Sequence, residues 1–177
     1  MEILFENKFV RDESTAKEIY GYWYFRKPLM IAVYVALGFY ALSCILGFIL
    51  DFDSARESMP VFAMILFFVA FVLISYRSQV KAMIQRDKEM SGGEPLCCTV
   101  SVSSEEITLS TLESRSPVSM SNVKSAFLTK NYIVVITKAR LMFILKKDSF
   151  TVGDTASFIA FLKEKGIRLM LAKGQKK

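Results

Sequence analysis

Two long stretches without a charged residue constrain this chain more than any other feature of its sequence. The first runs from Pro28 to Leu50, over 23 residues, and the second runs from Pro60 to Tyr76, over 17 residues. Helices of these lengths reach roughly 35 Å and 25 Å, and the hydrocarbon core of a bilayer is about 30 Å thick. A chain of 177 residues is too short to enclose two helices that are apolar on every side. We therefore expect both stretches to be transmembrane helices that form a hairpin.

The charges beside these stretches predict the orientation of the hairpin. Segment 51–59 lies between the stretches and carries three acidic residues and one arginine. The outer ends are flanked by basic residues, and cytoplasmic loops are enriched in lysine and arginine. We therefore expect a multi-pass cell-membrane protein with both termini in the cytoplasm and 51–59 as a short extracytoplasmic loop. The flanking basic residues are Arg26, Lys27, Arg77, Lys81, Arg86 and Lys88.

Segment 1–27 begins with a strand-like run and continues into a helix. Asp12 and Glu13 place acidic residues in the first helical turn, as is typical of a helix start. Tyrosine and tryptophan gather directly before the first span, and both favour the headgroup level of a bilayer. We expect an interfacial helix; an aromatic ligand platform is a second interpretation, and the strand-like start has a pattern that suits a later sheet. The expected interfacial anchors are Tyr20, Trp23, Tyr24, Arg26, Lys27 and, after the second span, Arg77.

A change of hydrophobic period marks the main domain boundary. Segment 77–95 has the composition of a cytoplasmic helical linker, and the glycines and proline of Ser91–Pro95 end it. Beyond this point Cys98, Val100 and Val102 alternate with polar residues, so the period falls from 3.6 to 2. We therefore expect a small cytoplasmic domain over 96–177.

The pattern inside this domain predicts an α+β fold. Strands are expected over 123–128, 132–137 and 140–146, joined by two tight turns, with a polar turn over 113–117. A final helix is expected from about 154 to 165. Its apolar stripe is Phe158, Phe161 and Leu162, and Gly166 suits its carboxyl end. The whole chain is thus predicted to be a membrane α-helical hairpin plus a small antiparallel half-barrel or roll capped by a C-terminal helix.

The order of two spans, meander and last helix resembles that of the bacterial YcxB-like proteins. The stretches Tyr132–Thr137 and Ile144–Phe150 carry the resemblance, which covers residues 97–165 best, while the layout covers the whole chain. The family usually has proline before the basic residue of the last strand, and Lys146 stands in that place here. The resemblance implies a pleckstrin-homology-like (PH-like) architecture for the last domain and a bacterial cell membrane. It implies no activity, since the family has no established catalytic residues.

The domain carries an excess of positive charge that suggests a binding surface. Residues 77–177 contain 17 Lys and Arg against 9 Asp and Glu. Each basic residue near an anionic leaflet contributes about 1 kcal/mol of attraction. We expect membrane-surface or partner binding, with an ordinary solvated surface and a specific headgroup pocket as alternatives. Nucleic acid is not an expected partner because no reader motif accompanies the charge. The candidate residues are Lys130, Lys138, Arg140, Lys146 and Lys147.

The residue types present argue against catalysis. The chain has no histidine, which removes the commonest general base and the commonest zinc ligand. Its three cysteines, Cys44, Cys97 and Cys98, are interpreted as structural residues. Cys97 and Cys98 are adjacent, so in a strand they point to opposite faces and are poorly placed to bind one ion together. There is no glycine-rich phosphate loop and no metal-ligand spacing. We expect no catalytic, cofactor-binding or metal-binding residue, no cofactor and no enzymatic activity.

Two classes of function remain. The first is a membrane-anchored, non-enzymatic cytoplasmic interaction module that binds a protein partner or the inner-leaflet surface. The second is an accessory or immunity-type subunit of a transporter or envelope system that acts through its transmembrane hairpin. The expected partners are the lipid bilayer and an unidentified membrane or cytoplasmic protein, and a homo-oligomer is left open.

Overall fold

The computed structural model describes residues 2–50, 52–94, 96–111 and 114–171, and it divides into two compact units. One unit, here called the domain, combines Met1–Ile19 with Met83–Lys177. The other, here called the hairpin, is Tyr20–Ala82. The sequence pattern predicted that the domain begins at residue 96. The structure adds two segments to it, the residues up to Ile19 and the residues from Met83 to 95.

The hairpin consists of two helices that are long and apolar enough to cross a membrane. Helix α2 spans Pro28–Leu50 and helix α3 spans Phe52–Met90. Only 6% and 11% of their most apolar windows are buried within the protein, which is not the environment of soluble core helices. The expectation of a loop over 51–59 is wrong for residues 52–59, which are helical; Asp51 lies outside the described residues. Alanine, arginine and glutamate at 55–57 are good helix formers, which favours this early start.

The N-terminal strand is an inner strand of the domain's larger sheet, here called sheet A. Strand β1 (Phe5–Arg11) pairs over its full length with β2 (Leu96–Val102), from Phe5 opposite Val102 to Arg11 opposite Leu96. The order of sheet A is β4-β3-β2-β1-β8. Its other strands are β3 (Glu106–Ser110), β4 (Arg115–Ser119) and β8 (Phe150–Val152). Of the interpretations of segment 1–27, the one in which its start joins the later sheet is therefore confirmed.

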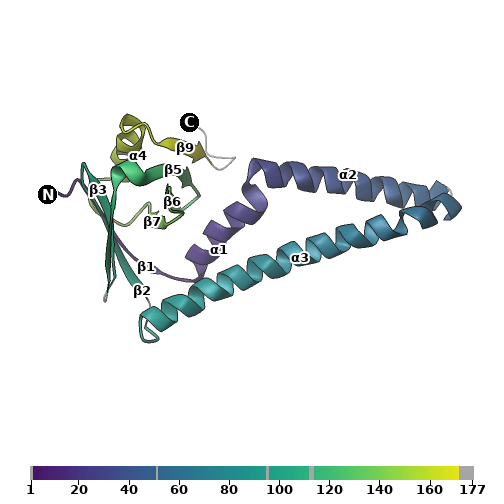
Figure 1. Ribbon diagram of the computed structural model, residues 1–177, viewed down its shortest axis with the longest axis horizontal. Helices are drawn as coiled ribbons and strands as arrows, with labels where there is room; N and C mark the ends of the chain where they lie inside the picture. The colour runs from purple at the N-terminus through teal and green to yellow at the C-terminus, as the bar shows by residue number, and fades with distance from the viewer. Residues whose placement is uncertain (1, 51, 95, 112–113, 172–177) are drawn as a thin grey trace. The chain divides into compact units, whose positions relative to one another are not determined.

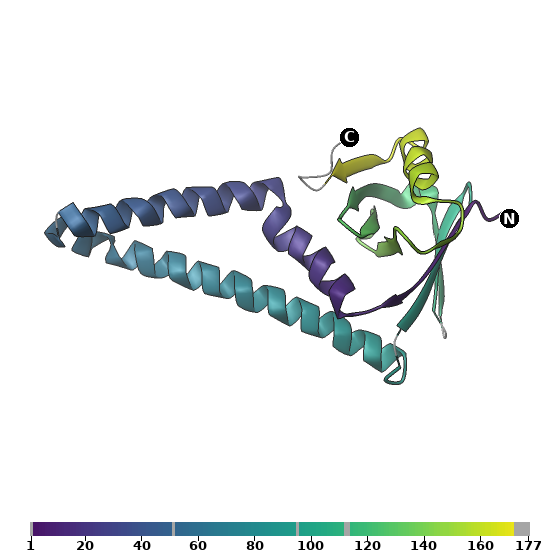
Figure 2. The same cartoon turned by 180° about the vertical axis from the view of Figure 1, so that it is seen from behind.

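This pairing gives the chain its unusual topology. Arg11 and Leu96 are neighbours across β1 and β2, so residues 12–95 form the connection of a β-hairpin. That connection contains α1 (Glu13–Gly21), the π-helical turn η1 (Tyr22–Arg26), α2 and α3. Figures 1 and 2 show β1 and β2 side by side, with β1 leading into α1 and β2 following α3. The chain therefore leaves β1 and returns to β2 at the same end of this strand pair.

The second sheet, sheet B, has the order β7-β6-β5-β9. Its antiparallel meander is the expected one, made of β5 (Val123–Leu128), β6 (Tyr132–Thr137) and β7 (Met142–Lys146). Strand β9 (Arg168–Leu171) adds a parallel edge that the sequence pattern did not predict. The polar turn expected over 113–117 is wrong for residues 115–117, because β4 occupies residues 115–119; Glu113 lies outside the described residues. Pro117 lies in an edge strand, where no ladder donor is needed.

The last helix, α4 (Thr155–Glu164), confirms the predicted C-terminal helix. Asp154 caps it by accepting hydrogen bonds from the backbone N–H groups of Ala156 and Ser157, at 2.8 Å and 3.0 Å. Hydrogen bonds from Ser157 and from these amides lower the pKa of the Asp154 carboxyl. Gly166 ends the helix in the left-handed region, with φ of 69°.

One hydrophobic core joins the two sheets and α4. Phe158 and Leu162 of α4 are completely buried in it, as the expected apolar stripe requires, and Phe161 packs against its border. The inner faces of the sheets supply most of the rest, and Met120 and Ile167 complete it from outside the strands. Sheet A contributes Phe5, Val100, Val102 and Ile107, and sheet B contributes Val123, Ala126, Leu128, Ile133, Val135, Phe143 and Leu145.

A buried asparagine connects the two sheets where β1 crosses the edge strand β7. The Asn7 side chain donates a hydrogen bond to the Lys146 carbonyl at 2.7 Å and accepts one from the Lys146 N–H at 3.0 Å. Asn7 is 0% exposed, so water does not reach this position. The side-chain amide therefore provides the hydrogen bonds that a neighbouring strand would otherwise give to the backbone of Lys146.

We predict that Asn7→Leu destabilises the domain by about 2 kcal/mol, because it leaves both backbone groups of Lys146 unpaired. Urea unfolding of the full chain in detergent measures this. Thr99→Val is the control, since Thr99 lies on the other face of sheet A and is half-buried. Equal stability of Asn7→Leu and the parent chain would contradict the prediction.

Candidate functional site

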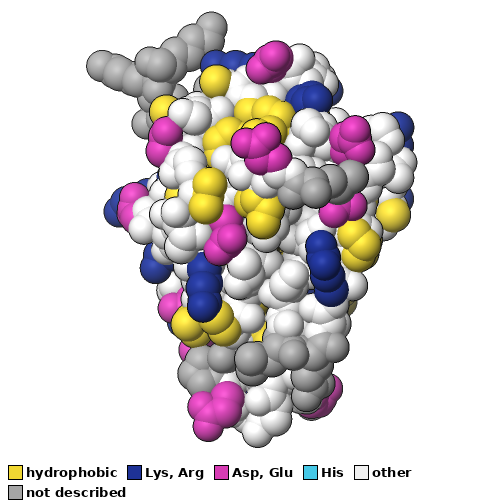
Figure 3. Space-filling view, turned by 90° about the vertical axis from the view of Figure 1, so that its left-hand side faces the viewer, with side chains coloured by type: hydrophobic (Ala, Val, Ile, Leu, Met, Phe, Trp, Pro, Cys, Tyr) yellow, Lys and Arg dark blue, Asp and Glu magenta, His cyan; other side chains and the backbone are white. Residues whose placement is uncertain are grey.

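The five predicted binding cations do not form one surface. Lys130 lies in the β5–β6 turn, and Tyr132 pairs with Lys146, so Lys130, Lys146 and Lys147 lie at one end of sheet B. Lys138 and Arg140 lie in the β6–β7 turn, at the opposite end. The six residues of β6, about 20 Å of strand, separate the two sets. On the face of the molecule shown in Figure 3, basic and acidic side chains are likewise interspersed.

At the first of these ends, the three lysines differ in how far their side chains are free to meet a partner. The Lys147 ammonium donates hydrogen bonds to the Thr129 and Lys130 carbonyls at 2.6 Å and 3.0 Å. Burial lowers the pKa of Lys147, and the carboxylates of Glu18 and Asp148 offset part of that effect. Lys146 is half-buried, whereas the side chain of Lys130 is exposed. Lys130 is therefore the lysine at this end that is best placed to meet an external anion.

Helix α1 is fixed to the same end of sheet B. Glu18 accepts hydrogen bonds from the backbone N–H and the side-chain amide of Asn131, at 2.8 Å and 2.7 Å. The hydroxyl groups of Thr15 and Tyr132 lie 2.9 Å apart in the interior. Ala16 is also buried, so the first part of α1 is a component of the domain core.

The predicted interfacial anchors gather around η1 in the hairpin. The Lys27 ammonium lies 3.9 Å from the centre of the Trp23 ring, a cation–π contact. The Tyr24 ring lies 6.0 Å from that of Tyr76 on α3, in an edge-on arrangement. Arg26 and Arg77 are exposed and Tyr20 is half-buried. Aromatic rings of the first segment thus contact the carboxyl end of the second apolar stretch, as expected for residues at a common interface.

A buried ion pair holds the two ends of the long connection together inside the domain. Arg11 ends β1, and Asp87 lies near the end of α3. The Arg11 Nε atom donates to one Asp87 carboxylate oxygen at 2.7 Å, and its Nη2 atom donates to the other. Their side chains are only 12% and 11% exposed. Bidentate geometry and low exposure favour a strong contact between the end of β1 and the end of α3.

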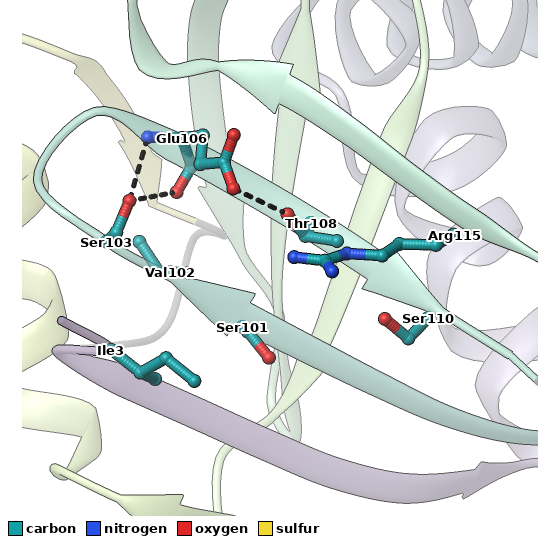
Figure 4. A pocket seen from close by; sticks show the side chains of 8 residues that line it. All are labelled: Ile3, Ser101, Val102, Ser103, Glu106, Thr108, Ser110 and Arg115. Carbon is teal, nitrogen blue, oxygen red and sulfur yellow. Dashed lines mark hydrogen bonds between the residues drawn. The ribbon is translucent and has the colours of Figure 1, made fainter. Parts of the chain in front are cut away.

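The outer face of sheet A carries a depression of about 480 Å³ over strands β2, β3 and β4, in which Ile3 and Val102 lie beside six polar or charged residues (Figure 4). Thr108 of β3 lies at its centre and is only 3% exposed. The Glu106 carboxylate and the Arg115 guanidinium both point toward Thr108, from opposite ends of the depression. Hydroxyl groups of Ser101 and Ser110 complete the polar lining. The sequence pattern indicated only that Ser101, Thr108 and Ser110 alternate with apolar residues along their strands. It did not predict the position of Arg115, which the pairing of β4 with β3 brings to the depression.

The described residues offer little redox or metal chemistry. No group of three or more His, Cys, Asp or Glu side chains suited to a metal occurs among them. Cys44, Cys97 and Cys98 are free thiols. Burial raises the pKa of Cys98, which disfavours its thiolate.

Comparison of the chain with protein-family models, with curated proteins and with solved structures gives no match. The class of protein is therefore defined by its fold and sites alone. It is a small α+β domain of two sheets with a C-terminal helix, and a hairpin of two long apolar helices is inserted between its first two strands.

Proposed function

We propose that this chain is a membrane-anchored, non-enzymatic interaction module of the YcxB-like kind, with a PH-like domain at the inner leaflet of a bacterial cell membrane. The observation that carries the proposal is the insertion of the apolar hairpin between β1 and β2. A domain that is joined by the chain to both ends of a membrane-spanning hairpin remains attached to the bilayer. Its partner is then an anionic membrane surface or a protein found there.

The attraction to the leaflet is assigned to the end of sheet B that carries Lys130. The Lys130 side chain is exposed at this end, whereas Lys138 and Arg140 lie at the other end of β6. Attraction to a charged leaflet decays within about 8 Å at physiological salt, so the position of each lysine decides its contribution.

The proposal is tested with the full chain in nanodiscs, by hydrogen exchange at residues 129–131. We expect phosphatidylglycerol to slow this exchange relative to phosphatidylcholine, and Lys130→Glu to reduce the protection about fivefold, the equivalent of one basic contact of about 1 kcal/mol. The matched control is Lys138→Glu with Arg140→Glu, which we expect to leave the protection at 129–131 unchanged. Protection that is independent of lipid charge would contradict the surface attraction.

The accessory-subunit function is the second candidate, and exposed aromatic residues on the hairpin favour it. Phe39 of α2 and Phe67 and Phe71 of α3 are 68%, 73% and 58% exposed, so they are available to a neighbouring membrane helix as well as to lipid. Replacement of residues 28–76 by an unrelated hairpin distinguishes the two candidates. Cross-linking in cells followed by mass spectrometry would then lose a stoichiometric membrane partner only if the second candidate is correct.

A further inference from the structure

The depression on the outer face of sheet A has the chemistry of a ligand site. Its volume of about 480 Å³ lies within the range of small-molecule sites, about 300–1,000 Å³. Glu106, Thr108, Ser110 and Arg115 belong to adjacent strands, so the sheet fixes their positions, whereas Ile3 and Ser103 complete the lining from outside the strands. A site built on a regular element holds its groups more accurately than a loop does.

Opposite charges face this depression without neutralising each other. Glu106 and Arg115 both line it, yet no ion pair joins them in the described part of the chain. Register explains the separation: Arg115 pairs with Ser110, which is four residues from Glu106 along β3. The only hydrogen bond between side chains of the lining is the long one, 3.5 Å, from the Thr108 hydroxyl to the Glu106 carboxylate. An anionic and a cationic group thus remain available across a common space.

The ligand that satisfies both ends is a small zwitterion. A guanidinium binds phosphate or carboxylate oxygens through paired N–H donors, and the hydroxyls of Ser101 and Ser110 supply further donors. The Glu106 carboxylate accepts hydrogen bonds from an ammonium group. We propose that this depression binds a molecule that carries a phosphate or carboxylate group and an ammonium group, either as a free metabolite or as a zwitterionic lipid headgroup.

This proposal does not rest on the basic residues of sheet B, so the two can fail separately. The experiment titrates the full chain, in phosphatidylglycerol nanodiscs that contain no ammonium group, by calorimetry. The probes are O-phosphoethanolamine, glycerophosphoethanolamine and L-alanine, with inorganic phosphate and ethanolamine as single-charge controls. We expect at least one zwitterion to bind more tightly than either single-charge control.

Two variants test which residues carry the binding. Arg115→Gln and Glu106→Gln should each weaken it by about tenfold or more, because each removes a charge-assisted contact. Lys8→Gln is the matched control, since Lys8 is a cation on the same face of sheet A, two strands away from β3 and outside the depression. No binding of any zwitterion, or equal effects of Lys8→Gln and Arg115→Gln, would overturn the proposal.

The same probes distinguish a lipid headgroup from a free metabolite as the ligand. Preference for glycerophosphoethanolamine, together with its displacement when phosphatidylethanolamine replaces part of the nanodisc lipid, indicates a headgroup. Preference for L-alanine indicates a free amino-acid-like metabolite. Either result supports the zwitterion site.

Discussion

A chain that begins at residue 96 should not fold. Residues 96–177 lack β1, which lies between β2 and β8 in sheet A and supplies Phe5 to the core and Asn7 to the contact with β7. Removal of a strand from the inside of a sheet exposes two rows of backbone hydrogen-bonding groups as well as apolar surface. We expect the isolated segment to show no cooperative urea transition and little amide protection.

The topology also predicts how the fold is recovered without the hairpin. Since Arg11 pairs with Leu96, replacement of residues 12–95 by a two-residue Asn-Gly turn joins β1 directly to β2. We expect this chain to unfold cooperatively, with protected amides in both strands, although without the contacts of α1. Cooperative folding of residues 96–177 alone, or failure of both chains, would contradict the assigned position of β1.

Disruption of the Arg11–Asp87 pair should be the most destabilising single polar change. Removal of one partner leaves an uncompensated charge in a nearly buried position, which costs about 3–5 kcal/mol. We therefore expect Asp87→Ala and Arg11→Met each to lower the urea midpoint of the full chain strongly. Hydrogen exchange should increase first at the Arg11 and Leu96 end of the strand pair, because the ion pair links this end of β1 to α3.

A double-mutant cycle separates the interaction energy of Arg11 with Asp87 from the effect of each substitution on its other contacts. The combination of Arg11→Met with Asp87→Leu should cost much less than the sum of the two single changes, since neither charge is left unpaired. Glu13→Gln is the matched control: it breaks the Lys17–Glu13 pair, whose side chains are 59% and 60% exposed, and should cost less than about 0.5 kcal/mol. Additive effects in the cycle, or an equal cost for the control, would show that the pair is not a structural link.

Local sequence pattern predicted the regular parts of this fold. The apolar stretches became α2 and the middle of α3, the alternation after residue 96 became strands, and the stripe of Phe158 and Leu162 became the core face of α4. These features follow from residue periodicity and from the exclusion of charge over a long helix, both of which can be read along the chain. The resemblance to YcxB-like proteins and the PH-like architecture are still predictions.

Long-range pairing was decided only by the tertiary structure. The short strand-like run at residues 5–11 carries no information on its neighbours, so its position between β2 and β8 could not be assigned from the sequence. The same holds for the Arg11–Asp87 pair and for the placement of Glu106 and Arg115 on either side of Thr108, because contacts between distant segments position these residues. It also holds for the basic residues, which antiparallel pairing separates to opposite ends of β6. The sequence by itself determined which segments are apolar helices and which are strands, and the hydrogen-bond register between distant strands decided where the functional side chains meet.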